Sequence, residues 1–68
     1  MKPYDVVALT VDLLDKNLKK GQVGTIIEQL EDEVFEVEFS DLNGVTYAML
    51  ALEAEQLMIL HYEQIVTP

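Results

Sequence analysis

Near the middle of the chain, the run VFEVEFS alternates apolar and polar side chains without a break. Phe35, Val37 and Phe39 fall on one side of an extended backbone, and Glu36 and Glu38 fall on the other. This period of two is typical of a β-strand with one face in a core and one face in water. The other apolar segments of the chain are therefore expected to pack on the apolar side of this strand.

Four more short runs are predicted to form strands, because they are rich in β-branched or aliphatic residues and are bounded by turn residues. Gly21 and Gly24 open the run before VFEVEFS, and such glycines suit a strongly bent strand at a barrel corner. Asn43-Gly44 is the strongest local turn signal, because both residues tolerate the positive φ angles of a tight hairpin. The predicted strands cover residues 5–10, 21–30, 34–40, 45–52 and 57–60.

Two connections complete the predicted architecture. Residues 11–20 are expected to form a long first loop, anchored to the core by Leu18 and Leu13, with Asn17 in a turn. Residues 53–56 favour helix but make only one turn, so we expect a 3₁₀ turn before the last strand. These elements predict an all-β fold, a small five-stranded SH3-like barrel.

A chain of 68 residues allows one domain. We expect the barrel over about residues 5–60 and a C-terminal tail over residues 61–68. The predicted core consists of the inward-facing apolar residues of the strands together with one anchor from the first loop. These residues are Val7, Leu9, Leu18, Val23, Ile26, Phe35, Val37, Phe39, Leu50, Leu52, Leu57 and Ile59.

Charge is distributed very unevenly along the chain. The formal net charge is -9, and all four basic residues are lysines that precede Gly21. The rest of the chain has ten carboxylates and no cation, so it repels polyanions. Such a surface either keeps a small apolar protein in solution or is shaped for a basic partner. The absence of cysteine and of a long apolar run agrees with a cytoplasmic protein that does not cross a membrane.

No set of residues points to an enzyme. Glu36 and Glu38 are expected about 7 Å apart on one strand face, which suits a general acid and base, but solvated charge on a convex face is the favoured interpretation. His61 is the single histidine, so a zinc site within one chain would need carboxylates as its other ligands. The acidic turns lack the regular ligand spacing of a calcium loop. We therefore expect no catalytic residue, no metal and no cofactor.

Hydrophobic residues make up half of the chain, which is more than a barrel of this size buries. Strand alternation turns part of this surplus outward, and exposed aromatic and methionine side chains are enriched in interfaces. Two outcomes stay open: the C-terminal tail covers these side chains within the monomer, or they bind a protein, either a basic partner or an identical chain. The predicted interaction residues are Tyr47, Met49, Met58, Leu60, Tyr62, Ile65, Glu36 and Glu38.

Four blocks of the sequence, DVVALT, GQVGTI, EVEFSDLNG and ALEAEQL, resemble the family called domain of unknown function 4926 in order and spacing. The resemblance extends from Asp5 to about Leu60, and it implies an SH3-like barrel in a bacterial cytoplasmic protein. It implies no activity and no catalytic residue. Leu14 departs from the family pattern, in which a proline or polar residue is expected. The pattern of Gly21, Gly24 and Ile26 is also similar to the KOW motif of ribosomal and transcription proteins.

The sequence thus predicts a non-catalytic, acidic protein-interaction module, of the kind formed by an antitoxin, an immunity-like protein or an assembly subunit. The alternative is a KOW-like domain associated with nucleic acid or the ribosome. The lack of cations after Gly21 disfavours that alternative, because phosphate contacts need lysine or arginine. Neither nucleic acid nor a membrane is expected among the partners.

Overall fold

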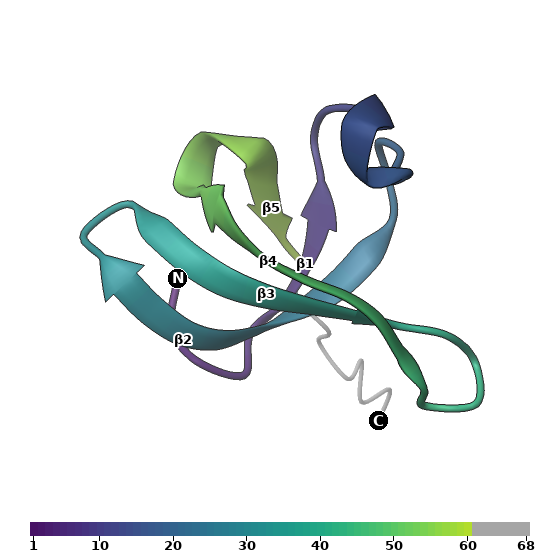
Figure 1. Cartoon of the computed structure of the whole chain (residues 1–68). Helices are drawn as coiled ribbons and strands as arrows, with labels where there is room; N and C mark the ends of the chain where they lie inside the picture. Colours follow the sequence, from purple (N-terminus) through teal and green to yellow (C-terminus); the bar gives the residue numbers. More distant parts are fainter. Residues whose placement is uncertain (61–68) are drawn as a thin grey trace, which may run out of the picture.

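The computed structural model describes residues 1–60, which form one antiparallel sheet of five strands (Figure 1). The strand order is β4-β3-β2-β1-β5, and the sheet curls around one apolar core. This is the predicted all-β SH3-like barrel, with the 3₁₀ turn η2 before the last strand. The elements are β1 (Val6–Leu9), η1 (Leu14–Lys16), β2 (Val23–Glu31), β3 (Val34–Ser40), β4 (Thr46–Glu53), η2 (Ala54–Gln56) and β5 (Leu57–Ile59).

The hairpin of β2 and β3 supplies four of the nine buried residues of the core cluster. All three apolar residues of the alternating run are buried: Phe35, Val37 and Phe39. The pairing of β2 with β3 is irregular, because Ile26 lies opposite Val37 but Glu28, two residues later, lies opposite Glu36. A second register shift follows between Gln29 and Glu31. Each shift adds one unpaired residue to β2, and such β-bulges bend a strand.

Gly24 allows β2 to lie very close to β3. A Cβ atom at Gly24 would be 2.9 Å from the carbonyl oxygen of Glu38 and 2.9 Å from each of two ring atoms of Phe39. The Phe39 ring therefore occupies the space that a side chain at Gly24 would need. Gly21 has a different role, because its φ of +92° favours glycine although nothing surrounds it. Gly24 is thus needed for close packing and Gly21 for its backbone conformation. The bulges that bend β2 lie further along the strand, after Ile26.

The turn between β3 and β4 is held by Asp41. Its carboxylate accepts hydrogen bonds from the backbone N–H groups of Asn43 (2.9 Å) and Val45 (3.0 Å). The N–H of Gly44 donates to the carbonyl of Asp41 at 3.0 Å, and Gly44 has a φ of +79°. This is a three-residue hairpin loop that ends in a left-handed glycine. Only the glycine of the Asn-Gly pair needs a positive φ, and β4 begins at Thr46.

The long first loop is anchored as predicted. Leu18 is buried, and its backbone exchanges two hydrogen bonds with that of Leu13, at 2.8 and 3.1 Å. Asn17 adopts the left-handed conformation with φ of +57° and closes the short 3₁₀ turn η1, which the sequence did not predict. Leu14 is 76% exposed, so the residue that departs from the family pattern takes no part in the core.

One member of the predicted core is wrong, and two are only partly correct. Val23 is 49% exposed, because it lies three residues before the buried Ile26 and the two cannot share a face of an unbroken strand. Leu50 and Ile59 pack against the core but are only partly buried. Ala8 is buried without having been predicted. The remaining nine predicted residues are buried: Val7, Leu9, Leu18, Ile26, Phe35, Val37, Phe39, Leu52 and Leu57.

Candidate functional site

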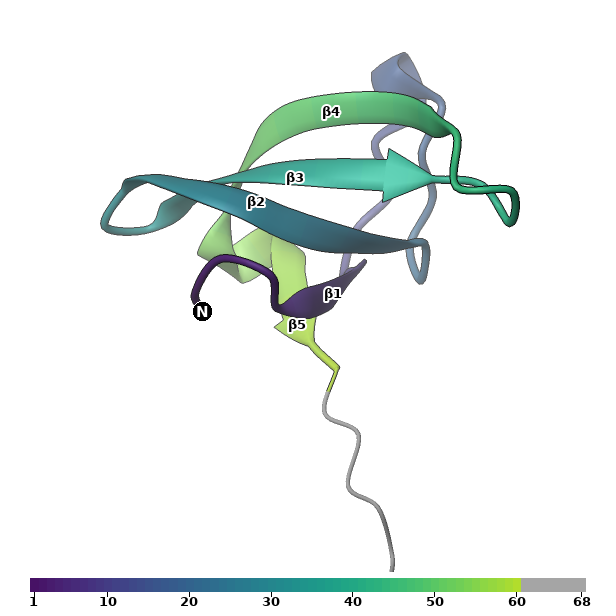
Figure 2. The ribbon, with the colours of Figure 1, turned by 90° about the horizontal axis from the view of Figure 1, so that it is seen from below.

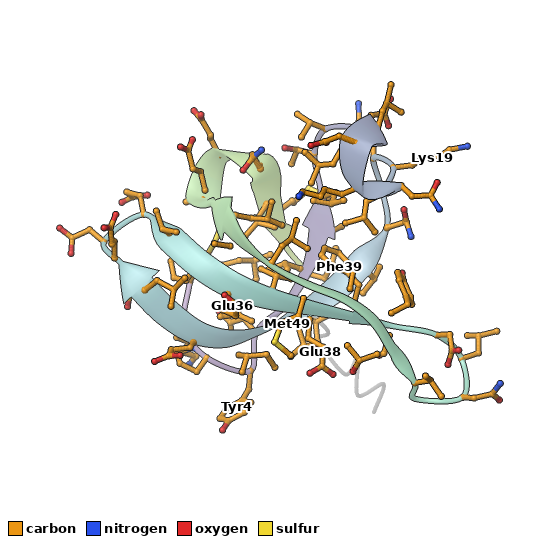
Figure 3. All side chains as sticks on the ribbon, in the orientation of Figure 1. Tyr4, Lys19, Glu36, Glu38, Phe39 and Met49 are labelled. Carbon is orange, nitrogen blue, oxygen red and sulfur yellow. The ribbon has the colours of Figure 1, made fainter. Side chains whose placement is uncertain are left out.

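The outer face of the sheet, meaning the face turned away from the core, brings carboxylates and apolar side chains together. Glu36 and Glu38 lie on this face because the residues that alternate with them fill the core. The strand register places Glu38 between Thr25 of β2 and Met49 of β4. Glu36, Glu38 and Met49 are grouped on β3 and β4 in Figure 3. A partner that contacts this face therefore meets charge and a flexible apolar side chain at once.

A second row of the outer face places two carboxylates at directly facing positions. Glu36 lies between Glu28 of β2 and Ala51 of β4. Like charges at facing positions of an antiparallel pair destabilise a sheet. No lysine or arginine occurs from Gly21 to the C-terminus, so these strands supply no cation to offset the pair. A cationic group from another molecule would relieve the repulsion between the two carboxylates.

The outer face becomes apolar toward β1 and β5. Ala8 of β1 lies between Val23 of β2 and Met58 of β5. Val23 and Met58 are about half exposed, at 49% and 53%. Val6 lies opposite Thr25, and its carbonyl accepts a hydrogen bond from the N–H of Leu60 at 2.9 Å. An apolar strip from β2 to β5 thus continues from the acidic rows.

Tyr47 lies where β4 meets the loop end of the barrel. The register of β3 and β4 shifts between Phe39 and Ser40, and Tyr47 is the extra residue of β4 at that shift. Its ring is 50% exposed, and its hydroxyl accepts a hydrogen bond from Nε2 of Gln22 at 3.0 Å. The side chain is therefore held in place while part of its surface remains open to a partner.

The structure places six of the eight predicted interaction residues. Tyr47, Met49 and Met58 are about half exposed, and Glu36, Glu38 and Leu60 are partly exposed. Tyr62 and Ile65, like His61, lie outside the described residues. Five of the six form two groups on different parts of the sheet: Met49 with the glutamates on β3 and β4, and Met58 with Leu60 near β5. Tyr47 lies at the start of β4, with its hydroxyl at Gln22.

The two groups lie at opposite ends of the sheet. β4 and β5 are the first and last strands of the sheet order. At about 4.8 Å per strand, the path along the sheet between them is about 19 Å. One partner covering both groups would need a large contact, so the β3–β4 group and the β5 group are best treated as separate surfaces.

Two residues of the outer face were missed by sequence reasoning. Glu28 faces Glu36 only because a β-bulge precedes it in β2, and no local sequence signal marks that bulge. Val23 was assigned to the core, although the period of two set by Gly24 and Ile26 predicts an outward position for it. The position of Glu28 could be found only from the structure, whereas the outward position of Val23 could have been predicted from the sequence.

The lysines of the first loop lie apart from the acidic rows. Lys16, Lys19 and Lys20 are exposed, and Lys19 is well separated from Glu36 and Glu38 in Figure 3. The loop backbone is fixed by side chains, since the N–H of Lys20 donates to Oδ1 of Asp12 at 2.8 Å. Three of the four lysines thus lie in the first loop, together with Asp12 and Asp15 and apart from Glu36 and Glu38.

A solvent-open hollow of about 270 Å³ lies between the β2–β3 turn and η2. Glu53 at its rim takes part in a capping box: its carboxylate accepts the N–H of Gln56, whose Oε1 accepts the N–H of Glu53 at 2.9 Å. The hollow is lined by Glu33, Val34, Glu53, Ala54 and Glu55.

Residues 1–60 contain no cluster of three or more side chains arranged to hold a metal ion. Among the same residues, no helix has the length and apolar character needed to cross a bilayer.

Comparison with known proteins gives one match. The family model described as Domain of unknown function (DUF4926) matches residues 4–59, which include all five strands. The match confirms the resemblance carried by the four sequence blocks. Searches of curated proteins and of solved structures found no match.

Proposed function

The chain belongs to the DUF4926 family, and we propose that it is a non-catalytic module that binds a basic protein through the β3–β4 part of its outer face. The observation that carries the proposal is the facing pair Glu28 and Glu36, with Glu38 beside them and no cation on these strands. Cross-strand pairs of like charge lower stability by up to about 1 kcal/mol. A basic partner neutralises the pair when it binds, so relief of this repulsion contributes to the binding free energy.

The surroundings of the carboxylates support a protein as the partner. Met49 lies directly beside Glu38 and is 52% exposed, and the half-exposed ring of Tyr47 is two residues away on β4. Flexible methionine and partly exposed tyrosine side chains are common at protein-binding surfaces. A surface of apolar groups among carboxylates fits a basic patch with aliphatic side chains, such as the stems of lysine and arginine.

Antitoxins, immunity proteins and assembly subunits are the kinds of protein that act in this way, by covering a basic surface of their partner. A cytoplasmic location is part of the proposal, and the absence of cysteine supports it. Electrostatic attraction between unlike charges weakens with salt, so binding of the partner is expected to weaken as salt is raised.

Quantitative capture tests the proposal. The purified protein and its Glu36→Gln/Glu38→Gln variant are immobilised and exposed to extract from the cells that produce the protein, and captured proteins are identified by mass spectrometry. A matched control is Asp15→Asn/Asp32→Asn, which removes the same charge from exposed residues outside the outer face. We expect a basic protein that the wild type and the control retain, that the outer-face variant loses, and that raised salt releases.

Two results would contradict the proposal. One is a captured set that is the same for the wild type and the Glu36→Gln/Glu38→Gln variant. The other is capture of nucleic acid or of the chain itself in place of a basic protein. Capture that the Asp15→Asn/Asp32→Asn control loses equally would show that net charge, and not the outer face, determines binding.

A further inference from the structure

β4 is an edge strand, and its backbone explains how a partner can be held. β4 lies at one end of the sheet order, and Figure 2 shows it as the outermost strand beside β3. Every second peptide group of an edge strand points away from the sheet and has no partner in it. The alternation of the hydrogen bonds between β3 and β4 shows which residues of β4 point to the free edge.

The hydrogen bond made by the first residue of η2 shows which peptide groups of β4 face β3. The N–H of Ala54 donates to the carbonyl of Glu33 at 2.8 Å, so the peptide groups of Ala54 face β3. By the alternation of an antiparallel ladder, those of Leu52 and Leu50 face β3 as well. The N–H and C=O groups of Met49 and Ala51 then point to the free edge. Within residues 1–60, no hydrogen bond from outside the β3–β4 ladder reaches the backbone of either residue.

The free edge around Met49 and Ala51 has no protection of the usual kinds. Natural edge strands are commonly blocked by lysine, by proline, by bulges or by being very short. β4 has eight residues, TYAMLALE, without lysine or proline, and its bulge is at its second residue, Tyr47, before Met49. Both Met49 and Ala51 are exposed. The edge can therefore accept another strand by main-chain hydrogen bonds.

Charge decides which strand fits. A side chain opposite Ala51 on an added strand would lie on the outer face, two strands or about 9.6 Å from Glu36. Alanine leaves the space between them open, so a lysine or arginine there can extend across Ala51 to Glu36, which faces Glu28. A second copy of β4 offers no cation, and it brings another chain of net charge -9.

We propose that the free edge of β4 binds an extended, basic segment of the partner as a sixth, antiparallel strand. The hydrogen bonds form with the backbone of Met49 and Ala51, and a lysine or arginine of the segment crosses Ala51 to the carboxylates of Glu36 and Glu28. The inference rests on the proposed function, because it gives the mode by which the same face takes a basic protein.

Amide exchange followed by NMR tests this binding mode. The probe is a short synthetic peptide of alternating lysine and valine, and its control is a peptide of alternating glutamate and valine. In the free protein, the amides of Met49 and Ala51 should exchange fast while those of Leu50 and Leu52 exchange slowly. Saturation with the lysine peptide should slow exchange at Met49 and Ala51 by tenfold or more, and the glutamate peptide should leave it unchanged.

Substitutions at Ala51 give a second, independent measurement. Ala51→Pro removes the N–H that points to the free edge, and Ala51→Gly keeps both this N–H and the open space beside Glu36. The lysine peptide should bind Ala51→Pro at least tenfold more weakly than Ala51→Gly. If Ala51→Pro does not fold, the exchange data on the wild type decide.

Each other outcome overturns the inference. Binding that needs Glu36 and Glu38 but leaves exchange at Met49 and Ala51 unchanged would mean that the face binds without the edge, and the proposed function would stand. Absence of binding by the lysine peptide would remove the edge as a site for basic segments. Protection of Met49 and Ala51 in the protein alone at high concentration, and not at low concentration, would identify a second copy as the occupant.

Discussion

Replacing Gly24 by alanine is expected to destabilise the barrel through close contacts of one added Cβ atom with β3. The added Cβ would lie 2.9 Å from the Glu38 carbonyl oxygen and from two ring atoms of Phe39. Phe39 is completely buried, so its ring has no solvent-filled space to move into. Overpacking of a core costs about 1–3 kcal/mol, and three close contacts, one of them with backbone, argue for the upper part, about 2–3 kcal/mol.

An opposing effect reduces this cost. Alanine lowers the conformational entropy of the unfolded chain relative to glycine, which favours folding by about 0.5–1 kcal/mol. The net loss for Gly24→Ala is therefore about 1–2.5 kcal/mol. For a domain of this size, that loss lowers Tm by roughly 4–20 °C. The measurement is thermal and urea denaturation followed by circular dichroism.

A double-mutant cycle identifies the Phe39 ring as the cause. Phe39→Leu removes the Cε1 atom that the new Cβ would meet and replaces the rigid ring by a smaller side chain, so Gly24→Ala should cost less in that background by at least about 0.5 kcal/mol. The reasoning is refuted if Gly24→Ala is as stable as the wild type, or if its cost is the same with and without the ring.

Three further perturbations follow from the structure. Asp41→Ala should lose about 0.5–2 kcal/mol in denaturation, because the carboxylate accepts the N–H groups of Asn43 and Val45; Asp41→Asn, which keeps an acceptor, should lose less. Glu28→Lys should gain about 0.5–1 kcal/mol at low salt by pairing with Glu36, a gain that an equal charge change in the exposed turn at Asp32 should not reproduce. Titration with RNA or DNA at physiological salt should give a Kd weaker than about 10⁻⁶ M, and tighter binding would contradict the charge argument.

The fold was predictable because its main signals are local. The alternation of Phe35, Val37 and Phe39 with glutamates defined β3 and its buried face. Leu18 was recognisable as an anchor because it is an isolated apolar residue among the lysines and polar residues of a loop. Asn43-Gly44 marked the turn between β3 and β4 by its intrinsic backbone preferences. Each of these predictions depended on residues close together in the chain.

The parts that escaped prediction depend on pairing between strands. Whether Glu28 faces Glu36 depends on a β-bulge, which arises from the fit of β2 to the barrel and leaves no signal in the sequence. Strand order determines that Met49 and Met58 lie on the two end strands of the sheet, and this separation could not be read from their shared exposure. The special need for glycine at Gly24 likewise follows from the position of Phe39 on the neighbouring strand.

The central claim is that the β3–β4 part of the outer face binds a basic protein, and NMR titration tests it most directly. Isotope-labelled protein is titrated with the purified basic protein identified by capture, and amide shifts are followed residue by residue. The account predicts the largest changes at Glu36, Glu38 and Met49, and their loss as salt is raised. Changes confined to the lysine-bearing loop at Lys16, Lys19 and Lys20 would contradict it.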